Sequence, residues 1–238
     1  MAEWFTDWFG EEYLDLYPHR DERDAERLIG LVRRTLPWRD GWRVLDVACG
    51  PGRHMGALEA AGARVFGFDL SHVLLNRART VTSRPLVRAD MRHLPFRAGS
   101  MDLTVNLFTS FGYFATDVEH DAAMGEMLGT VRNGGWLVLD FLDAAVVRAG
   151  LVPREVRQLG GACVEVRREI LDDGRVVRKT ILLPDGRQFE ERVRLFSFGE
   201  LQTMIEQHGA RVLTGFGDYD GAPAGGGPRA ILLAQVAP

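Results

Sequence analysis

A loop with two glycines, set between an apolar strand and a helix, constrains the fold of this chain most. Residues 44–54 read Val-Leu-Asp-Val-Ala-Cys-Gly-Pro-Gly-Arg-His, with a predicted strand at 43–47 and a predicted helix at 54–61. Gly50 and Gly52 let the backbone turn tightly and approach a ligand closely. The helix then presents its N-terminus to that ligand. The pattern therefore predicts a ligand crevice at the carboxyl edge of a parallel sheet.

Strand and helix patterns alternate along most of the chain. Short apolar segments between turn residues predict seven strands, at 43–47, 64–68, 85–89, 102–107, 136–140, 210–216 and 229–236. Helical spacing predicts the connecting helices, at 21–34, 54–61, 71–80, 117–132 and 199–208. Asn133-Gly134-Gly135 is the predicted stop of the fourth of these helices. This alternation favours a parallel sheet with helices on both faces.

The pattern changes to period-two alternation between about residues 150 and 197. The segments 163–170, 176–183 and 188–195 alternate apolar and polar residues. Asp172-Asp173-Gly174 and Pro184-Asp185-Gly186 separate them and are typical of hairpin turns. We therefore expect an antiparallel sheet inserted into the α/β fold.

Two acidic residues are predicted at the same sheet edge as the glycine loop. Asp69 ends the second strand, where a carboxylate can accept both hydroxyls of a ribose. Asp90 ends the third, where a carboxylate can accept an adenine amino group. Together with the loop, they predict an adenosine-containing ligand.

These motifs, in this order, resemble those of class I S-adenosylmethionine-dependent methyltransferases. Asp-Val-Ala-Cys-Gly-Pro-Gly at 46–52 is similar to the first motif of that family, with Ala48 where the family often has glycine. The segments 68–71, 89–91, 101–114 and 132–137 are similar to the next four. The resemblance implies an α/β fold with a seven-stranded, mostly parallel Rossmann-like sheet and, here, the inserted antiparallel β-sheet. The resemblance covers about residues 42–142 and 199–236.

The resemblance also implies a cofactor, S-adenosylmethionine, with S-adenosylhomocysteine as product. The cofactor-binding residues that it implies are Asp46, Ala48, Gly50, Gly52, Arg53, Asp69, Leu70, Asp90, Met91 and Leu107. Three domains are expected: a helical lid at 1–40, the cofactor-binding α/β domain at 41–145 and 198–238, and the inserted sheet at 146–197.

The aromatic N-terminal segment has two interpretations. Its rings can simply be packed in a core. Alternatively, Tyr13, Tyr17 and Arg20 fold over the cofactor, with Arg20 pairing its carboxylate in a charge-assisted contact. Related small-molecule methyltransferases use their N-terminal segment in this second way.

Two other functions are alternatives to that of a methyltransferase. An NAD-dependent oxidoreductase is disfavoured because the third glycine of G-x-G-x-x-G is replaced by Met55 or Arg53, according to the alignment. Asp46 would also place a negative charge beside the NAD pyrophosphate. A non-catalytic or regulatory S-adenosylmethionine-binding protein stays open.

The acceptor is expected to be a small molecule, with nitrogen and oxygen acceptors both open. The fourth strand runs into Asn106-Leu-Phe-Thr-Ser-Phe-Gly-Tyr113 and lacks the Asn/Asp-Pro-Pro-Tyr/Phe pattern of nucleobase and amide N-methyltransferases. Candidates for the acceptor wall are Phe111, Tyr113, Phe114, Tyr219 and Arg229, and no catalytic base stands out. The inserted sheet resembles that of sugar N-methyltransferases, which implies a substrate cover and a homodimer contact.

Composition excludes several partners. A net charge of −4 without a Lys/Arg run disfavours nucleic acid, although Lys179 is the only lysine in a chain rich in arginine. Six histidines without ligand spacing predict no metal site. No apolar run approaches ~18 residues, so no membrane span is expected. The acidic start and two unpaired cysteines lead us to expect a cytoplasmic protein.

Overall fold

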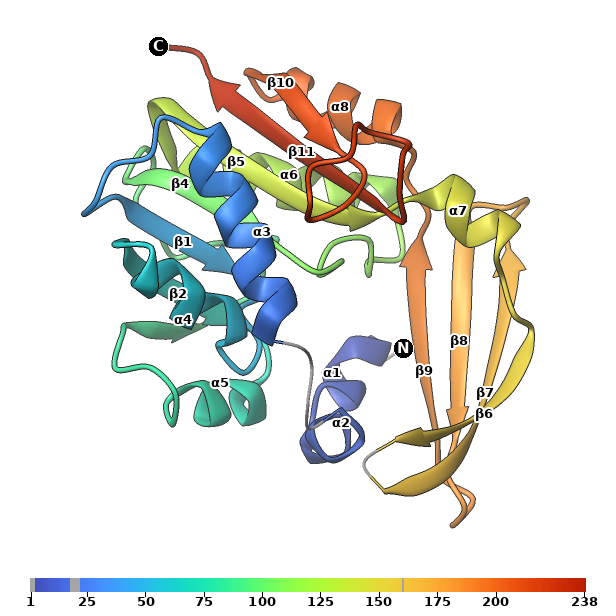
Figure 1. The fold of residues 1–238 in the computed structure, drawn as a ribbon. Helices are drawn as coiled ribbons and strands as arrows, with labels where there is room; N and C mark the ends of the chain where they lie inside the picture. The colour runs from blue at the N-terminus through green and yellow to red at the C-terminus, as the bar shows by residue number, and fades with distance from the viewer. Residues whose placement is uncertain (1–2, 18–21, 160) are drawn as a thin grey trace.

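The computed structural model describes residues 3–17, 22–159 and 161–238 and contains a seven-stranded main sheet (Figure 1). In spatial order its strands are β10 (Ala210–Phe216), β11 (Arg229–Val236), β5 (Val131–Leu142), β4 (Met101–Asn106), β1 (Arg43–Val47), β2 (Arg64–Asp69) and β3 (Leu86–Arg88). The five strands from β5 to β3 are parallel, whereas β11 runs antiparallel to both β5 and β10. The predicted Rossmann-like α/β fold is confirmed.

Helices cover both faces of the main sheet. They are α3 (Glu22–Thr35), α4 (Arg53–Ala60) and α5 (His72–Ala78) with one core, and α6 (Asp117–Thr130) and α8 (Phe198–Gln207) with another. Leu28, Met55 and Leu58 belong to the first core, and Met124 and Ile205 to the second. Among the described residues, no helix has the length and apolarity that crossing a bilayer requires.

Side-chain caps fix where several helices begin. Ser71 accepts a hydrogen bond from the amide of Leu74 and starts α5, as its position in the sequence predicts. Thr116 with Glu119 forms a capping box at the start of α6, and Ser197 does the same at α8. These caps satisfy backbone amide groups at the starts of α5, α6 and α8.

The boundary between α6 and β5 lies earlier than predicted. The helix ends at Thr130 instead of 132, and the strand begins at Val131 instead of 136. Gly134, at φ +68°, bends the strand locally, and a Cβ on Gly135 would lie 2.7 Å from Val131 Cγ1. The two glycines therefore shape an irregularity within a strand and do not stop a helix.

The inserted sheet has four antiparallel strands, one more than predicted. They are β6 (Arg154–Leu159), β7 (Ala162–Leu171), β8 (Val176–Leu182) and β9 (Gln188–Arg194), in that spatial order. The short helix α7 (Ala144–Ala149) leads into this sheet and was also not predicted. The polar composition of β6, Arg-Glu-Val-Arg-Gln-Leu, hides its alternation.

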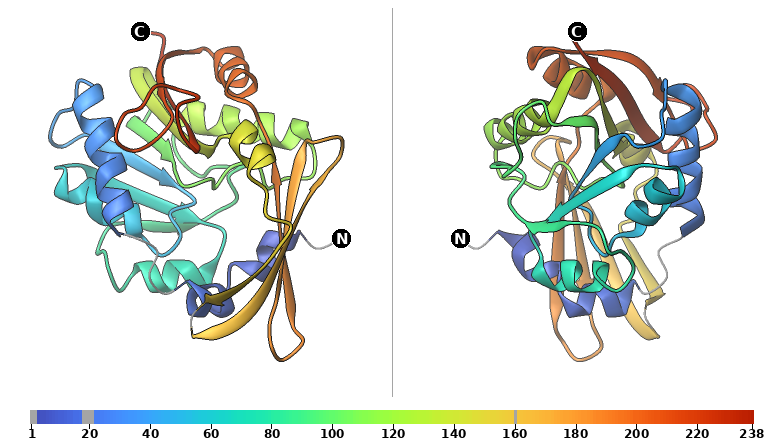
Figure 2. Two further views of the ribbon diagram at one scale, coloured as in Figure 1. Left: turned by 45° about the vertical axis from the view of Figure 1, so that its right-hand side comes forward. Right: turned by 90° about the vertical axis from the view of Figure 1, so that its left-hand side faces the viewer.

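Two short N-terminal helices lie between the main sheet and the inserted sheet (Figures 1 and 2). They are α1 (Trp4–Trp8) and α2 (Glu11–Leu16). Trp8, Tyr13 and Leu16 pack with Leu74 of α5 and with apolar residues of the inserted sheet, Val164, Val166 and Ile181. The N-terminal aromatic residues thus bridge the two sheets.

Candidate functional site

The glycine loop that follows β1 has an unusual backbone. Gly52 caps α4 at φ +86°, and a Cβ there would lie 3.1 Å from Val81 Cγ2 and 3.3 Å from Ala78 Cβ. Glycine is therefore required at this position for both conformation and space. Ala48 also has a positive φ, +57°, in a region that disfavours a side chain. The family that the sequence resembles often has glycine at this position.

Asp69 ties the end of β2 to this loop. The amide of Gly50 donates to Asp69 Oδ2 at 2.9 Å, and the amide of Ser71 donates to Oδ1 at 2.8 Å. Burial raises the pKa of Asp69 to about 6, although these amide hydrogen bonds favour the ionised form. The carboxylate is thereby fixed at the carboxyl edge of the sheet.

Asp46 is a buried carboxyl group beside Asp69. Its side chain is almost fully buried, and Oδ2 has no hydrogen-bond partner among the described residues. Burial first, and then the charge of Asp69, raise the pKa of Asp46 to about 8, against a lowering by Arg53. Such a pair is stabilised by a bound cation. The amino group and sulfonium of S-adenosylmethionine carry that charge, so these residues fit the cofactor that the sequence implies.

A cleft of about 770 Å³, including its part open to solvent, lies over the loop. Of the predicted cofactor residues, Tyr13, Ala48, Gly50, Asp69, Leu70, Asp90 and Met91 line it. Apolar residues complete the wall, among them Phe5, Phe9, Phe68, Leu74 and Phe114. A mostly apolar lining with a few polar groups is typical of a site for a small ligand.

Five other predicted cofactor residues that the structure describes do not line the cleft, namely Asp46, Gly52, Arg53, Leu107 and Tyr17. Gly52 lies against Ala78 and Val81, and Leu107 is buried in the core. The Arg53 guanidinium stacks on Phe108, with 4.3 Å between its Cζ and the ring centre. Tyr17 receives a hydrogen bond from Lys179. Arg20 lies outside the described residues.

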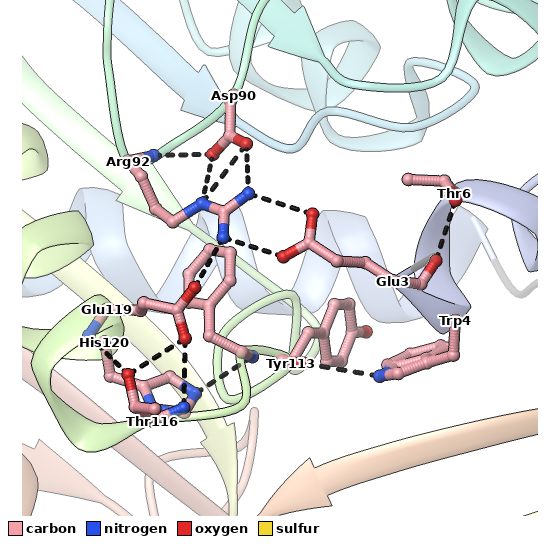
Figure 3. Close-up of polar contacts among 10 residues, drawn as sticks. Glu3, Trp4, Thr6, Asp90, Arg92, Tyr113, Thr116, Glu119 and His120 are labelled. Carbon is pink, nitrogen blue, oxygen red and sulfur yellow. Dashed lines mark hydrogen bonds and ion pairs between the residues drawn. The ribbon is translucent and has the colours of Figure 1, made fainter. Parts of the chain in front are cut away.

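Asp90 belongs to a network centred on Arg92 (Figure 3). The guanidinium donates to both oxygens of Asp90, to both oxygens of Glu3 at 2.7 and 2.9 Å, and to Glu119 at 2.7 Å. It also stacks on Phe114, 4.7 Å from the ring centre. One arginine thereby joins the N-terminal segment to the end of β3 and to the start of α6.

Other contacts hold the N-terminal helices over the cleft. Ser71 Oγ donates to the carbonyl of Phe9 at 2.5 Å, and Trp4 Nε1 donates to the carbonyl of Tyr113 at 3.3 Å. The Trp4 and Tyr113 rings meet edge to face, 4.9 Å apart. The segment 3–17 therefore closes one side of the cleft.

A second cavity, of about 1320 Å³ with its open part, lies between the main sheet and the inserted sheet. It is lined by apolar residues of the β5–α7 region and by charged residues of the inserted sheet, namely Glu155, Arg157, Arg168, Lys179 and Glu191. Phe108 and Tyr113 line both this cavity and the cleft. The two spaces thus share one wall.

A buried carboxylate holds this shared wall. Asp140, which is fully buried, accepts hydrogen bonds from the amide of Phe108, the hydroxyl of Tyr219 and Nε of Arg229. Phe108 and Thr109 have positive φ angles of +57° and +62°. Backbone strain of this kind persists where surrounding contacts fix it, and it gathers at functional sites.

The predicted acceptor residues divide into two groups. Tyr113 and Arg229 line the second cavity, whereas Phe114 lines the cleft. Phe111 is fully buried in the α6–α8 core and lines neither space, so its side chain offers no surface to an acceptor. Tyr219 stands behind the wall, where its hydroxyl donates a hydrogen bond to Asp140.

Two buried histidines are neutral near pH 7. Burial lowers the pKa of His54 to about 3 and that of His120 to about 4. His120 Nε2 accepts a hydrogen bond from the amide of Phe114, and its ring packs on Phe111 and Phe196.

Sequence reasoning did not select Phe108, Arg92 or the charged residues of the second cavity. Phe108 follows the apolar strand β4 directly, which marks it as an edge residue. Arg168 and Lys179 stand at alternating positions that share a sheet face with buried Val166 and Ile181. Charges on the apolar side of a strand are a signal that sequence alone contains.

Comparisons with known proteins agree with this geometry. A methyltransferase-domain family model matches residues 44–135. The chain is 30% identical over 173 residues to dTDP-3-amino-3,4,6-trideoxy-alpha-D-glucopyranose N,N-dimethyltransferase of Streptomyces venezuelae, covering 65% of this chain and 71% of that one.

Solved structures share the fold over nearly the whole chain. An S-adenosylmethionine-dependent methyltransferase from Clostridium acetobutylicum has a TM-score of 0.81 at 15% identity, covering 95% of this chain and 98% of that one. The amino pentose methyltransferase CalS10 of Micromonospora echinaspora, solved with S-adenosylmethionine bound, has a TM-score of 0.68 at 24% identity, covering 94% of each.

Proposed function

Since the chain belongs to the class I S-adenosylmethionine-dependent methyltransferases, we propose that it methylates an amine nitrogen of a small polar molecule. The observation that carries the proposal is the wall of Phe108 and Tyr113, which separates the cofactor cleft from the second cavity. The cleft would hold the methyl donor, and the second cavity would hold the acceptor. We call this second space the acceptor cavity below.

The wall favours a nucleophile that needs no base. Phe108 and Tyr113 supply aromatic surface, and the buried carboxylate that holds Phe108, Asp140, is already hydrogen-bonded to Arg229 and Tyr219. A neutral amine attacks without prior proton removal, whereas a hydroxyl group usually needs a base. Relatives named as N,N-dimethyltransferases support the same choice.

The chain's own residues would supply alignment and a dry pocket. S-adenosylmethionine, when bound, supplies a methyl group already activated on a sulfonium. A neutral amine held at Phe108 and Tyr113 would accept that methyl group on nitrogen, S-adenosylhomocysteine would be left, and the ammonium product would lose its proton to water. Phe108 and Tyr113 would exclude water, while Asp140 would keep Phe108 in place.

We further propose that residues 3–17 act as a lid over the cofactor. Phe5, Phe9 and Tyr13 line the cleft, and the Arg92 and Ser71 contacts fasten this segment. On the basis of the same contacts, we propose that the chain divides into this lid, the cofactor-binding α/β domain and the inserted sheet as a substrate cover. A homodimer formed through the inserted sheet remains a prediction.

Paired substrates test the proposed function. S-adenosylhomocysteine binding, measured by calorimetry, should be clear, and NAD should not bind. Methyl transfer from labelled S-adenosylmethionine should then occur with amino sugars and not with the hydroxyl sugars that match them. Transfer to the hydroxyl members alone would overturn the choice of nitrogen. Cofactor binding without turnover across a broad metabolite extract would instead indicate a regulatory protein.

A further inference from the structure

The inner face of the inserted sheet carries a row of charged side chains. Arg168 on β7, Lys179 on β8 and Glu191 on β9 stand opposite one another in register. Each side chain is largely buried, with about a fifth of its surface exposed, and all three line the acceptor cavity. Charged groups are seldom held inside a fold without a partner or a task.

The ion pairs in the cavity leave positive charge in excess. Arg157 Nε and Arg168 Nη1 both form ion pairs with the same oxygen of Glu155, at 2.8 and 2.5 Å. These two arginine contacts lower the pKa of Glu155, which keeps it ionised. Two guanidinium groups therefore share one carboxylate.

The remaining charges of the cavity are matched. Lys179 Nζ lies 3.1 Å from Glu191 and donates to the hydroxyl of Tyr17 at 2.8 Å. Arg229 pairs with buried Asp140 at 2.7 Å. Among the described residues that line the cavity, the uncompensated charge lies at Arg157 and Arg168.

We propose that Arg157 and Arg168 bind an anionic group, a carboxylate or a phosphate, on the methyl acceptor. The inference rests on the proposed function, because it assigns the acceptor to this cavity. A guanidinium matches carboxylate and phosphate oxygens in a planar fork. Burial of Arg168, which is 19% exposed, strengthens the attraction, whereas Arg157 is 53% exposed. The acceptor would carry both an amine, placed at Phe108 and Tyr113, and an acidic group at the inserted sheet.

The only lysine of the chain offers a reporter for this site. Lys179 stands next to Arg168 across the β7–β8 pair, and every other basic side chain, histidines aside, is arginine. An amine-acylating reagent therefore modifies one side chain, and peptide mass spectrometry separates that product from the acylated N-terminus. An anion bound at Arg168 will shield Lys179 from the reagent.

The test uses the full chain saturated with S-adenosylhomocysteine. Acylation of Lys179 is timed in inorganic phosphate, in succinate and in potassium chloride of equal ionic strength. An anion at five times its dissociation constant should slow labelling about sixfold. Protection by phosphate alone, or by succinate alone, would distinguish the two anion sources.

Neighbouring arginines provide a matched pair of variants. Arg168→Met should abolish the protection, whereas Arg167→Met should keep it, because Arg167 faces outward and pairs with Glu165. Arg157→Met is a second cavity variant, and thermal melting checks that each variant folds. Protection that survives both cavity variants, or no protection by either anion in the natural chain, would overturn the inference.

Cofactor binding is measured on the same samples. If S-adenosylhomocysteine does not bind, the proposed function fails, whatever the anions do. If it binds and the anions give no arginine-dependent protection, only the anion site fails.

Discussion

Replacing Glu3 with glutamine should speed release of the product S-adenosylhomocysteine. Glu3 is bound by both terminal nitrogens of Arg92, and this is the contact that joins the lid to the end of β3. If residues 3–17 cover the cofactor as proposed, this contact must break before the product leaves. Glu3→Gln keeps the shape of the side chain but removes its charge.

The size of the effect follows from how exposed the pair is. Arg92 keeps 19% of its side-chain surface exposed and Glu3 36%. Exposed ion pairs are worth about 0.2–1 kcal/mol, and bidentate geometry places this pair near the top of that range. Arg92 stays paired with Asp90 and Glu119 after the change, so no buried charge is stranded. A loss of about 1 kcal/mol corresponds to a roughly fivefold faster release.

Stopped-flow dilution of the product complex, followed by tryptophan fluorescence, measures this rate. Asp7→Asn is the matched control, because it removes the same charge from an exposed position on α1. Added salt should speed release from the natural chain and have less effect on Glu3→Gln. Equal release rates for Glu3→Gln and Asp7→Asn would refute the proposed role of the Glu3–Arg92 contact. Full additivity of Glu3→Gln and Arg92→Met in a double-mutant cycle would refute it as well.

Three further predictions concern the two carboxylates and the loop. Because the pKa of Asp46 rises from about 4 unfolded to about 8 folded, the cofactor-free protein loses up to about 1.4 kcal/mol per pH unit as pH rises through this window. Asp46→Asn should flatten the pH dependence of Tm there, and an unchanged slope would contradict it. Ala48→Gly should relieve strain at φ +57° and, after the entropy cost, stabilise by about 0.5 kcal/mol in urea unfolding. Tyr219→Phe should lower the free energy of unfolding by only about 1 kcal/mol, because Asp140 keeps its hydrogen bonds to Arg229 and Phe108. A decrease in the free energy of unfolding above about 3 kcal/mol would contradict this and would mean that the wall of Phe108 and Tyr113 is disrupted.

Local patterns predicted the main sheet well, because buried parallel strands read as apolar runs. The final strands at 210–216 and 229–236 match β10 and β11 at both ends. The end of α6 was misplaced since glycine, which often stops a helix, here shapes a strand irregularity at Gly134 and Gly135. Strand β6 was missed because charged side chains on both of its faces conceal the period of two.

Contacts between distant residues could not be predicted from local patterns. Arg92 and Glu3 are separated by 89 positions, and neither belongs to a motif. Phe111 was expected at the acceptor because it follows β4, yet the chain turns after Phe108 and sends that ring into the core. Only the three-dimensional packing decides which aromatic residue after a strand faces a cavity.

The inserted sheet is joined to the rest of the fold at two places that lie close together. The chain leaves through the end of β5 and returns at Arg194, and a Cβ on Gly112 would lie 3.3 Å from Phe141 and 3.2 Å from the Arg194 carbonyl. Both junctions therefore lie against the same residue, Gly112. Under the proposed placement of the acceptor, mutations within the inserted sheet would alter which molecule is methylated and leave the glycine loop intact, so acceptor specificity could evolve, or be exchanged by grafting, separately from cofactor binding.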